Sequence, residues 1–329
     1  MKNSYLYLLS TAWKHATTKK KLFVAVYVFF IFSNVVVSLR PIVYGWFIGE
    51  LQGTEEGVVS FAWTYVAIYI GIYILEWMFN GPARLAENKM AFHIGKNFTS
   101  SLYDKLLHLP VDWHKTHHTG ATVNRIRKAE TAIKSFFKGA SWHLRMIIQL
   151  VTAVAAMIYF SPWFALVAIA LGVVSMFAVG RFDGPYVRSL DEVNEGEHKV
   201  SAALTDSLTN IITVTTLRLE NKFSQRLLKV IDNVFKPFWR GVWYNEGKWF
   251  TAGFLVNVIY CIMVMGFVYT HHVPGQPFDI GGLVTLLGFV FQFTGVFVDV
   301  GALYTQIMKD RTDVKAVEGI EALYQEYHS

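Results

Sequence analysis

Residues 146–180 form a run of 35 residues without one Asp, Glu, Lys or Arg, and this run constrains the fold more than any other feature. A membrane-spanning helix needs about 20 mostly apolar residues, so the run is too long for one span. Ser161-Pro162 lies near its middle, and proline cannot continue a helix interior. We therefore expect two membrane-spanning helices, about 143–160 and 162–180, joined by a very tight hairpin.

Four further charge-free runs are long enough to cross a bilayer, at residues 22–39, 57–75, 249–278 and 280–298. Charged residues make up 16% of the chain, whereas a soluble domain has about 25%. The sequence therefore predicts an all-α integral membrane protein with six transmembrane helices. The predicted spans are about 22–50, 57–80, 143–160, 162–180, 249–271 and 280–308.

The positive charges predict the orientation of these spans. All 30 Lys and Arg residues except Arg40 fall in residues 1–21, 81–145, 181–248 and 309–329, and the connections on the opposite side contain none. Cytoplasmic segments carry the excess of Lys and Arg in membrane proteins. We expect both termini and both long loops to be cytoplasmic, in the cell (inner) membrane. The net charge of +6 then reflects membrane topology and does not indicate nucleic-acid binding.

The two cytoplasmic loops, 81–145 and 181–248, are long and carry apolar residues at helical spacing. In the first loop these residues are Ile94, Phe98, Leu102, Leu106 and Leu109. We expect spans two to five to continue as helices, so that each loop is a long helical hairpin. At 1.5 Å per residue, about 25 extra residues project roughly 35 Å. Such hairpins could carry motion from a cytoplasmic partner into the membrane.

The N-terminal residues 1–21 precede the first span and combine an apolar face with a basic end. Residues at helical spacing, namely Tyr5, Leu6, Leu9, Trp13 and Ala16, are followed by Lys19-Lys20-Lys21. This pattern favours a short helix on the membrane surface, with the lysines among the lipid headgroups. A disordered tail is the alternative.

The two loop tips carry related motifs. The first contains a leucine-rich helix ending in Leu109-Pro110, then Trp113, Thr119-Gly120 and Arg125. The residues of the second are Asp206, Ile212, Val214, Leu217 and Glu220. Both tips, at these places in a six-span chain, resemble the intracellular loops of ABC exporter transmembrane domains. The resemblance covers nearly the whole chain, with 309–329 corresponding to the start of the linker to an ATPase domain.

The resemblance implies a homo- or heterodimer in which spans four and five pack against the other subunit, that is, a domain-swapped dimer. It also implies that both tips, at 110–120 and 207–217, dock on cytoplasmic nucleotide-binding domains and couple them to the membrane. ATP and Mg would then be bound by those partner domains, with no cofactor on this chain. The implied activity is ATP-driven export of an amphipathic or hydrophobic solute by alternating access.

The sequence contains no phosphate-binding G-x-x-x-x-G-K-[ST] loop. The nearest string, which runs from Gly241 to Trp249, has five residues between its glycines and Trp where the hydroxyl residue should be. We therefore predict no catalytic residue on this chain. ATP hydrolysis is expected on an ATPase domain outside this sequence or on a separate subunit.

Three neutral polar residues are predicted near mid-depth in the spans: Asn34, Gln149 and Gln292. They could face a solute cavity or hydrogen-bond between helices. Counting helical rise places Arg40 near the outer interface and Glu76 and Asp299 near the inner one. There they would serve as interface anchors, with a role as substrate ligands as the alternative. The pair Arg40-Pro41 is expected to kink the first span.

Two other functions compete with the exporter. An ion-coupled carrier or channel would not use ATP, and it would require charged residues at mid-depth. More remotely, His114-x-x-His117-His118 matches the histidine box of membrane di-iron enzymes. Those enzymes need several such boxes on one membrane face, whereas this chain has one. We therefore expect no metal site.

Overall fold

The computed structural model describes residues 4–53, 57–111, 113 and 119–328, and these residues form helices and short connections without a strand. The helices are α1 (Ser4–Ala16), α2 (Lys20–Ser38), α3 (Arg40–Gly53), α4 (Val58–Leu107), α6 (Thr119–Lys138), α7 (Ala140–Phe160), α8 (Pro162–Thr209), α9 (Ile211–Thr216), α10 (Glu220–His271), α11 (Ile280–Lys315) and α12 (Glu318–His328), with a 3-10 turn at Thr17–Lys19. Six of these helical segments are long and apolar enough to cross a membrane. The predicted all-α fold with six spans is confirmed.

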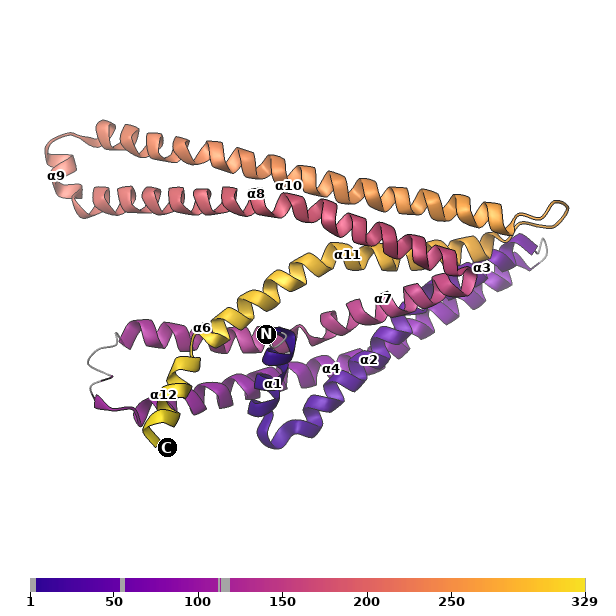
Figure 1. Ribbon diagram of the computed structural model, residues 1–329, viewed down its shortest axis with the longest axis horizontal. Coiled ribbons are helices and arrows are strands. Elements are labelled where there is room, and N and C mark those ends of the chain that lie inside the picture. The colour runs from indigo at the N-terminus through magenta and orange to yellow at the C-terminus, as the bar shows by residue number, and fades with distance from the viewer. Residues whose placement is uncertain (1–3, 54–56, 112, 114–118, 329) are drawn as a thin grey trace. The chain divides into compact units, whose positions relative to one another are not determined.

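The chain forms two compact units. The first consists of Met1–Ala165 with Val264–Ser329, and the second of Leu166–Met263. Figure 1 colours the chain from indigo to yellow, so the first unit takes both ends of the scale and the second the middle.

The core of the first unit lies where α1, α2, α4, α6 and the C-terminal helices meet. On α4, Ile94, Phe98 and Leu102 follow one another at intervals of four residues and are almost completely buried. Residues four apart share one face of a helix, so the helical pattern predicted for the first loop is the buried stripe of α4. Phe136 and Phe137 complete the core from α6.

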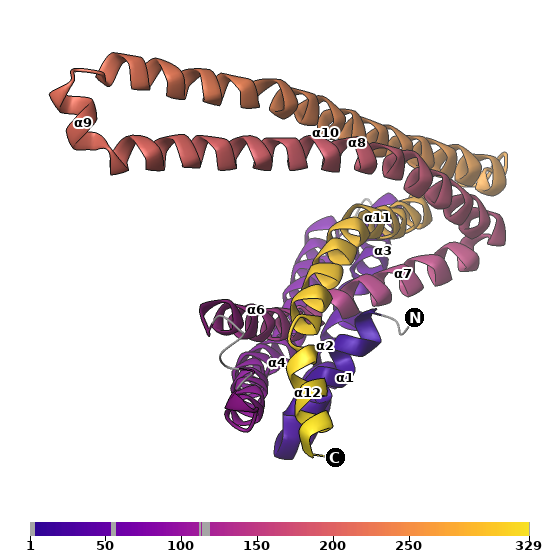
Figure 2. The same cartoon turned by 60° about the vertical axis from the view of Figure 1, so that its left-hand side comes forward.

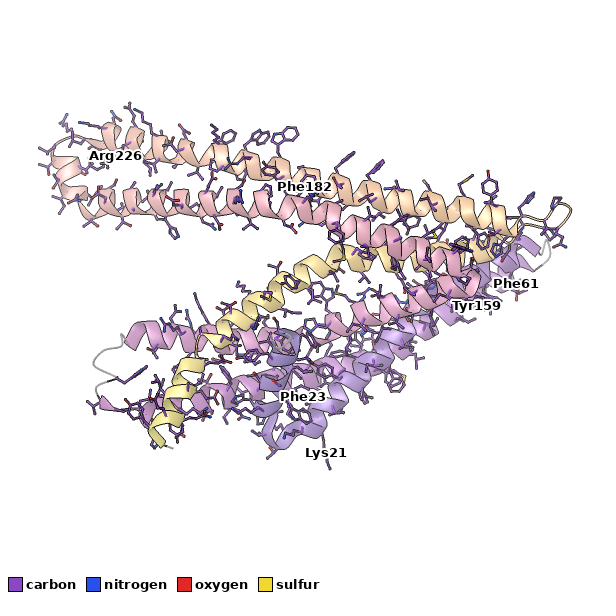
Figure 3. The ribbon with its side chains drawn as sticks, in the orientation of Figure 1. Lys21, Phe23, Phe61, Tyr159, Phe182 and Arg226 are labelled. Carbon is purple, nitrogen blue, oxygen red and sulfur yellow. The ribbon has the colours of Figure 1, made fainter. Side chains whose placement is uncertain are left out.

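The N-terminal helix α1 packs on this core through part of the predicted apolar face, namely Tyr5, Leu9 and Ala16. Leu8, Ala12 and Ala16 are fully buried, whereas Leu6 and Trp13 are exposed. Helix α1 is therefore apolar on two sides, and its location at a membrane surface stays a prediction. One side contacts the protein, and the other remains open. At the start of α2, Lys21 points away from the unit (Figure 3).

The first span contains the expected break near proline. Helix α2 ends at Ser38 and α3 begins at Arg40. Because Pro41 has no N–H, the α-helical hydrogen-bond ladder cannot continue through it. At this point the Ile42 N–H donates to the Leu39 carbonyl at 3.1 Å, one residue closer than in an α-helix.

A glycine seam joins α3 to α11 beyond this break. The backbones approach so closely that a Cβ on Gly281 would lie 2.6 Å from the Gly45 carbonyl oxygen and 2.9 Å from the Gly49 Cα. A Cβ on Gly45 would overlap Thr285. Small residues allow this kind of close helix contact within membranes.

The second unit is a helical hairpin, in which α8 and α10 run antiparallel and α9 crosses their far end (Figures 1 and 2). Ion pairs join the two long helices: Lys248 to Asp183 at 2.6 Å, and Arg240 to Glu192. Most of the apolar side chains remain exposed. An aromatic series on α10 runs through Phe235, Trp239 and Trp243 at intervals of one helical turn, and the rings contact one another.

Candidate functional site

The first predicted coupling segment lies between α4 and α6. Leu109 is buried, and Trp113 packs against the core of the first unit. The backbone N–H of Trp113 donates to the Pro110 carbonyl at 3.1 Å, and this hydrogen bond forms a turn after α4. The aromatic residue of this tip therefore anchors the tip to its own unit.

Other residues predicted for this tip are only partly described. Helix α6 begins with Thr119 and Gly120, and Arg125 lies exposed one to two turns later. Residues 112 and 114–118, including the three histidines of the histidine-box motif, lie outside the described residues. Among the residues that are described, no group of three or more His, Cys, Asp or Glu side chains could hold a metal ion.

The second predicted tip contains the short cross-helix α9. The Leu219 N–H donates to the Val214 carbonyl at 2.8 Å, and the Arg218 N–H donates to the Thr215 carbonyl at 3.2 Å. Arg218 has a φ of +51°. This is the Schellman arrangement that ends many helices, with arginine where glycine is usual. A left-handed conformation costs a non-glycine residue about 1 kcal/mol.

The side chains of this second tip divide between packing and exposure. Val214 is buried, while Ile212 is 80% exposed and Leu217 is 61% exposed. Asp206 is exposed and accepts a hydrogen bond from Asn210 at 3.3 Å. Glu220 is the first residue of α10. The tip thus combines a hydrogen-bonded capping turn with two exposed apolar side chains, those of Ile212 and Leu217. Exposed apolar side chains of this kind are typical of a docking surface.

A charged network near the first tip was missed by the sequence reasoning. The Glu321 carboxylate of α12 accepts hydrogen bonds from Lys14 of α1 and Lys105 of α4, each at 2.7 Å. Burial alone would raise the pKa of Glu321, but the two lysines lower it to about 2. Next to Lys14, burial and the lysine charge lower the pKa of His15 to about 4. The three partners lie far apart in sequence, so no local pattern could reveal them.

Two of the predicted cavity residues make hydrogen bonds at helix contacts. Asn34 is buried, and its amide donates to the Phe30 carbonyl at 2.8 Å and to the Ser141 carbonyl at 3.5 Å. Gln292 of α11 donates to the Ser38 carbonyl at 2.9 Å, at the break in the first span. Gln149 is half-buried on α7. A role in a solute cavity stays a prediction for all three.

Arg40 and Glu76 form an ion pair at 2.7 Å between α3 and α4. The prediction that placed Arg40 near one membrane interface and Glu76 near the other is therefore wrong, since the two side chains lie at the same depth. Counting residues from each helix end failed because adjacent spans are offset along their axes. The Arg40 guanidinium also lies 5.8 Å from the ring centre of Tyr69.

Six apolar spans, two helical hairpins and a cross-helix at the described tip are the framework of a membrane transport domain. The family model for the ABC transporter transmembrane region matches residues 23–297, which is more than half of the chain. The chain therefore belongs to this family.

A relative of the chain is the mitochondrial iron-sulfur clusters transporter ATM1 of Candida glabrata. It is 20% identical over 243 residues, covering 71% of this chain and 32% of that protein. The chain thus spans about a third of the length of this relative.

Proposed function

We propose that this chain is the membrane permease part of an ATP-driven exporter. It would move an amphipathic or hydrophobic solute out of the cytoplasm by alternating access, with both termini on the cytoplasmic side. A second copy, or a homologous transmembrane domain, would complete the transport pathway. Separate nucleotide-binding domains would bind ATP and Mg and dock on the hairpin tips. The family match and the likeness to an iron-sulfur clusters transporter support this function.

The observation that carries the proposal is the tip of the second hairpin. Helix α9 ends in a hydrogen-bonded capping turn, and Ile212 and Leu217 are exposed to solvent. A partner bound to these apolar side chains could move the two long helices that the tip joins. Apolar surface at this end of a hairpin is costly in water unless another protein covers it.

The test uses the tagged full chain, purified from its native membranes with whatever partners remain bound. We expect ATPase activity to accompany the wild-type chain. Ile212→Asp should reduce the accompanying activity at least about tenfold, because a buried unpaired charge in an interface costs several kcal/mol. Ile212 suits this test better than Trp113, whose substitution would disturb the core of the first unit.

Val187→Asp is the matched control, since Val187 is exposed on α8 and lies about 33 Å from Thr209 by helical rise. Equal ATPase activity with wild type and Ile212→Asp would refute the assignment of the tip. No ATPase activity with any variant would refute the ATP-driven function itself.

An ATP-independent carrier is the second candidate, and the ion pair of Arg40 and Glu76 favours it. Charged residues within spans are typical of carriers. The two functions are separated by reconstituting the wild-type chain alone into liposomes. Solute movement driven by an ion gradient, with no ATPase present, would support the carrier.

A further inference from the structure

The ion pair of Arg40 and Glu76 lies between the apolar runs of the first two spans. Arg40 is the one charged residue between Lys21 and Glu50 in the sequence, and Glu76 is the one between Glu56 and Arg84. Aromatic contacts between the first two spans lie on either side of the pair. The rings of Phe32 and Phe79 stack at 5.5 Å, and those of Phe47 and Tyr65 stack at 4.2 Å.

These contacts give the depth of the pair. Phe32 lies ten residues into the apolar run that begins at Leu22, which is about 15 Å by helical rise. Glu76 lies about one turn beyond Phe79, on the side away from the long loop. The pair is therefore farther than about 15 Å from one edge of the apolar run. On its own helix Arg40 lies about 27 Å by helical rise from Leu22 and about 15 Å from Glu50, so the pair lies inside the apolar run of the first span.

Stability alone is a poor reason for an ion pair at this depth. Removing two charges from water costs several kcal/mol each, and apolar residues of similar size often stabilise a protein equally well. Ionisable residues within spans most often serve a substrate or ion pathway. The question is therefore what ligand this pair could accept.

The guanidinium of Arg40 retains donors that could bind a further group. Its Nη2 donates to Glu76, but its Nε is buried and has no hydrogen-bond partner among the described residues. The side chain is 31% exposed, compared with 18% for Glu76. Arginine has five N–H donors arranged to bind carboxylate or phosphate through two parallel hydrogen bonds. Arg40 is therefore the more exposed partner, and one of its donors, the buried Nε, is unpaired.

The break in the first span holds Arg40 in place. The Ser38 carbonyl, which is not used by the Ile42 N–H, accepts a hydrogen bond from Gln292. On the same side of α11, a Cβ on Gly288 would lie 2.6 Å from Pro41 Cβ, so this helix passes directly against the break. Arg40 thus projects from a backbone position that contacts with α11 restrain.

We propose that Arg40 binds an acidic group, a carboxylate or a phosphate, of the amphipathic solute that this chain transports. Glu76 is the resident counter-ion, which keeps Arg40 paired when no solute is bound. It also weakens solute binding by competition, so that the solute can leave. The inference rests on the proposed transport function, and it narrows the solute to amphipathic acids.

The test measures binding to the full chain in a neutral detergent, without nucleotide or partner. The probe is 11-bromoundecanoate, whose bromine quenches tryptophan fluorescence. The control ligand is the uncharged alcohol 11-bromoundecanol. The wild type should bind the acid in preference to the alcohol. Arg40→Gln should weaken acid binding at least about tenfold, because the hydrogen bond between the guanidinium and the charged acid is lost. Glu76→Gln should tighten it about tenfold, and alcohol binding should change in neither variant.

The tighter acid binding expected for Glu76→Gln cannot result from misfolding, since a misfolded protein would not bind the acid more tightly. The matched control is the double substitution Lys199→Gln with Glu195→Gln, which removes an exposed ion pair of 2.7 Å on α8. It should leave the preference for the acid unchanged. Equal binding of acid and alcohol by the wild type and by Glu76→Gln would overturn the proposal and make the pair a structural link between helices.

A final arm separates a transported solute from a bound lipid. The titration is repeated in nanodiscs of phosphatidylcholine, with and without phosphatidylglycerol. Phosphatidylglycerol should not displace the acid probe. Displacement that depends on Arg40 would assign the site to an anionic lipid and overturn its assignment to solute. Failure of any arm leaves ATP-driven transport standing, because no ATPase takes part in the measurement.

Discussion

The loops 81–145 and 181–248 have similar lengths, but the hairpins that they form are stabilised in different ways. The first, built from α4 and α6, shares a core with α1 and the C-terminal helices, and Trp113 at its tip packs against that core. The second, built from α8 and α10, buries little of its apolar surface. Leu208, Ile212 and Leu217 at its tip are all exposed.

If the proposed function holds, a partner outside its own unit covers the exposed apolar side chains of the second hairpin. An aromatic series on α10 and an apolar cross-helix would be unfavourable in water. In the proposed dimer, the other subunit covers the long helices and an ATPase domain covers the tip. The first hairpin needs no such partner for its stability, so the two regions should respond differently to the same substitution.

The largest difference is expected from removing one apolar side chain from each hairpin. Ile94→Ala in the first should lower the free energy of unfolding by about 2–5 kcal/mol, because Ile94 is fully buried. Leu208→Ala in the second should change it by about 0.5 kcal/mol or less, because Leu208 is 66% exposed. Unfolding of the purified single chain in detergent measures both. Equal losses would show that the second hairpin has a core of its own.

A second prediction concerns the glycine seam between α3 and α11. Gly281→Ala should destabilise the first unit by about 1–3 kcal/mol, since the new methyl would collide with backbone atoms of Gly45 and Gly49. Gly295→Ala lies on the same helix with open space around it, and it should be neutral or slightly stabilising. Thermal unfolding in detergent compares the pair. A neutral Gly281→Ala would mean that the two helices separate readily.

The charged network of Glu321 should make the first unit sensitive to acid. The pKa of Glu321 is about 2 in the folded chain, below its ordinary value of 4.5. The network therefore contributes stability above pH 4.5, and the contribution is lost as the pH falls toward 2. Glu321→Gln should cost about 1 kcal/mol or less at pH 7, because Lys14 is largely exposed.

Unfolding of the wild type and Glu321→Gln at pH 7 and pH 3 tests this sign. The difference in free energy of unfolding between the wild type and Glu321→Gln should be smaller at pH 3 than at pH 7. A difference that grows on acidification would show that Glu321 does not depend on its charge.

The smallest effect is expected for the ion pair of Arg240 and Glu192 in the second hairpin. Both side chains are about half exposed, so water and salt screen their attraction. Glu192→Gln should change the free energy of unfolding by about 0.5 kcal/mol or less. The unfolding midpoint at low and high salt measures it. If Glu192→Gln lowers the free energy of unfolding more than Glu321→Gln does, ion pairs contribute more to the second hairpin than to the first.

The sequence allowed the spans and the helical hairpins to be predicted because each depends on local properties. A charge-free run of sufficient length needs no distant partner to become a membrane helix. The break at Pro41 and the turn at Ser161 were likewise predictable, since proline acts on its own helix. At the candidate site, the sequence predicted where the two tips lie in the chain. It did not predict which of their side chains are exposed. Trp113 and Leu217 are both apolar, and only the neighbouring helices bury the first of them.

The positions of Arg40 and Glu76 along their helices could not be predicted from the sequence either. In the sequence, Arg40 and Glu76 each follow the end of a charge-free run, and because successive spans cross in opposite directions they are expected at opposite interfaces. The tertiary structure brings them to 2.7 Å, because the stacking of Phe32 on Phe79 offsets the second span against the first. Apolar length determines that a helix crosses the membrane. Packing between side chains from distant parts of the sequence determines which residues of two helices lie at the same level.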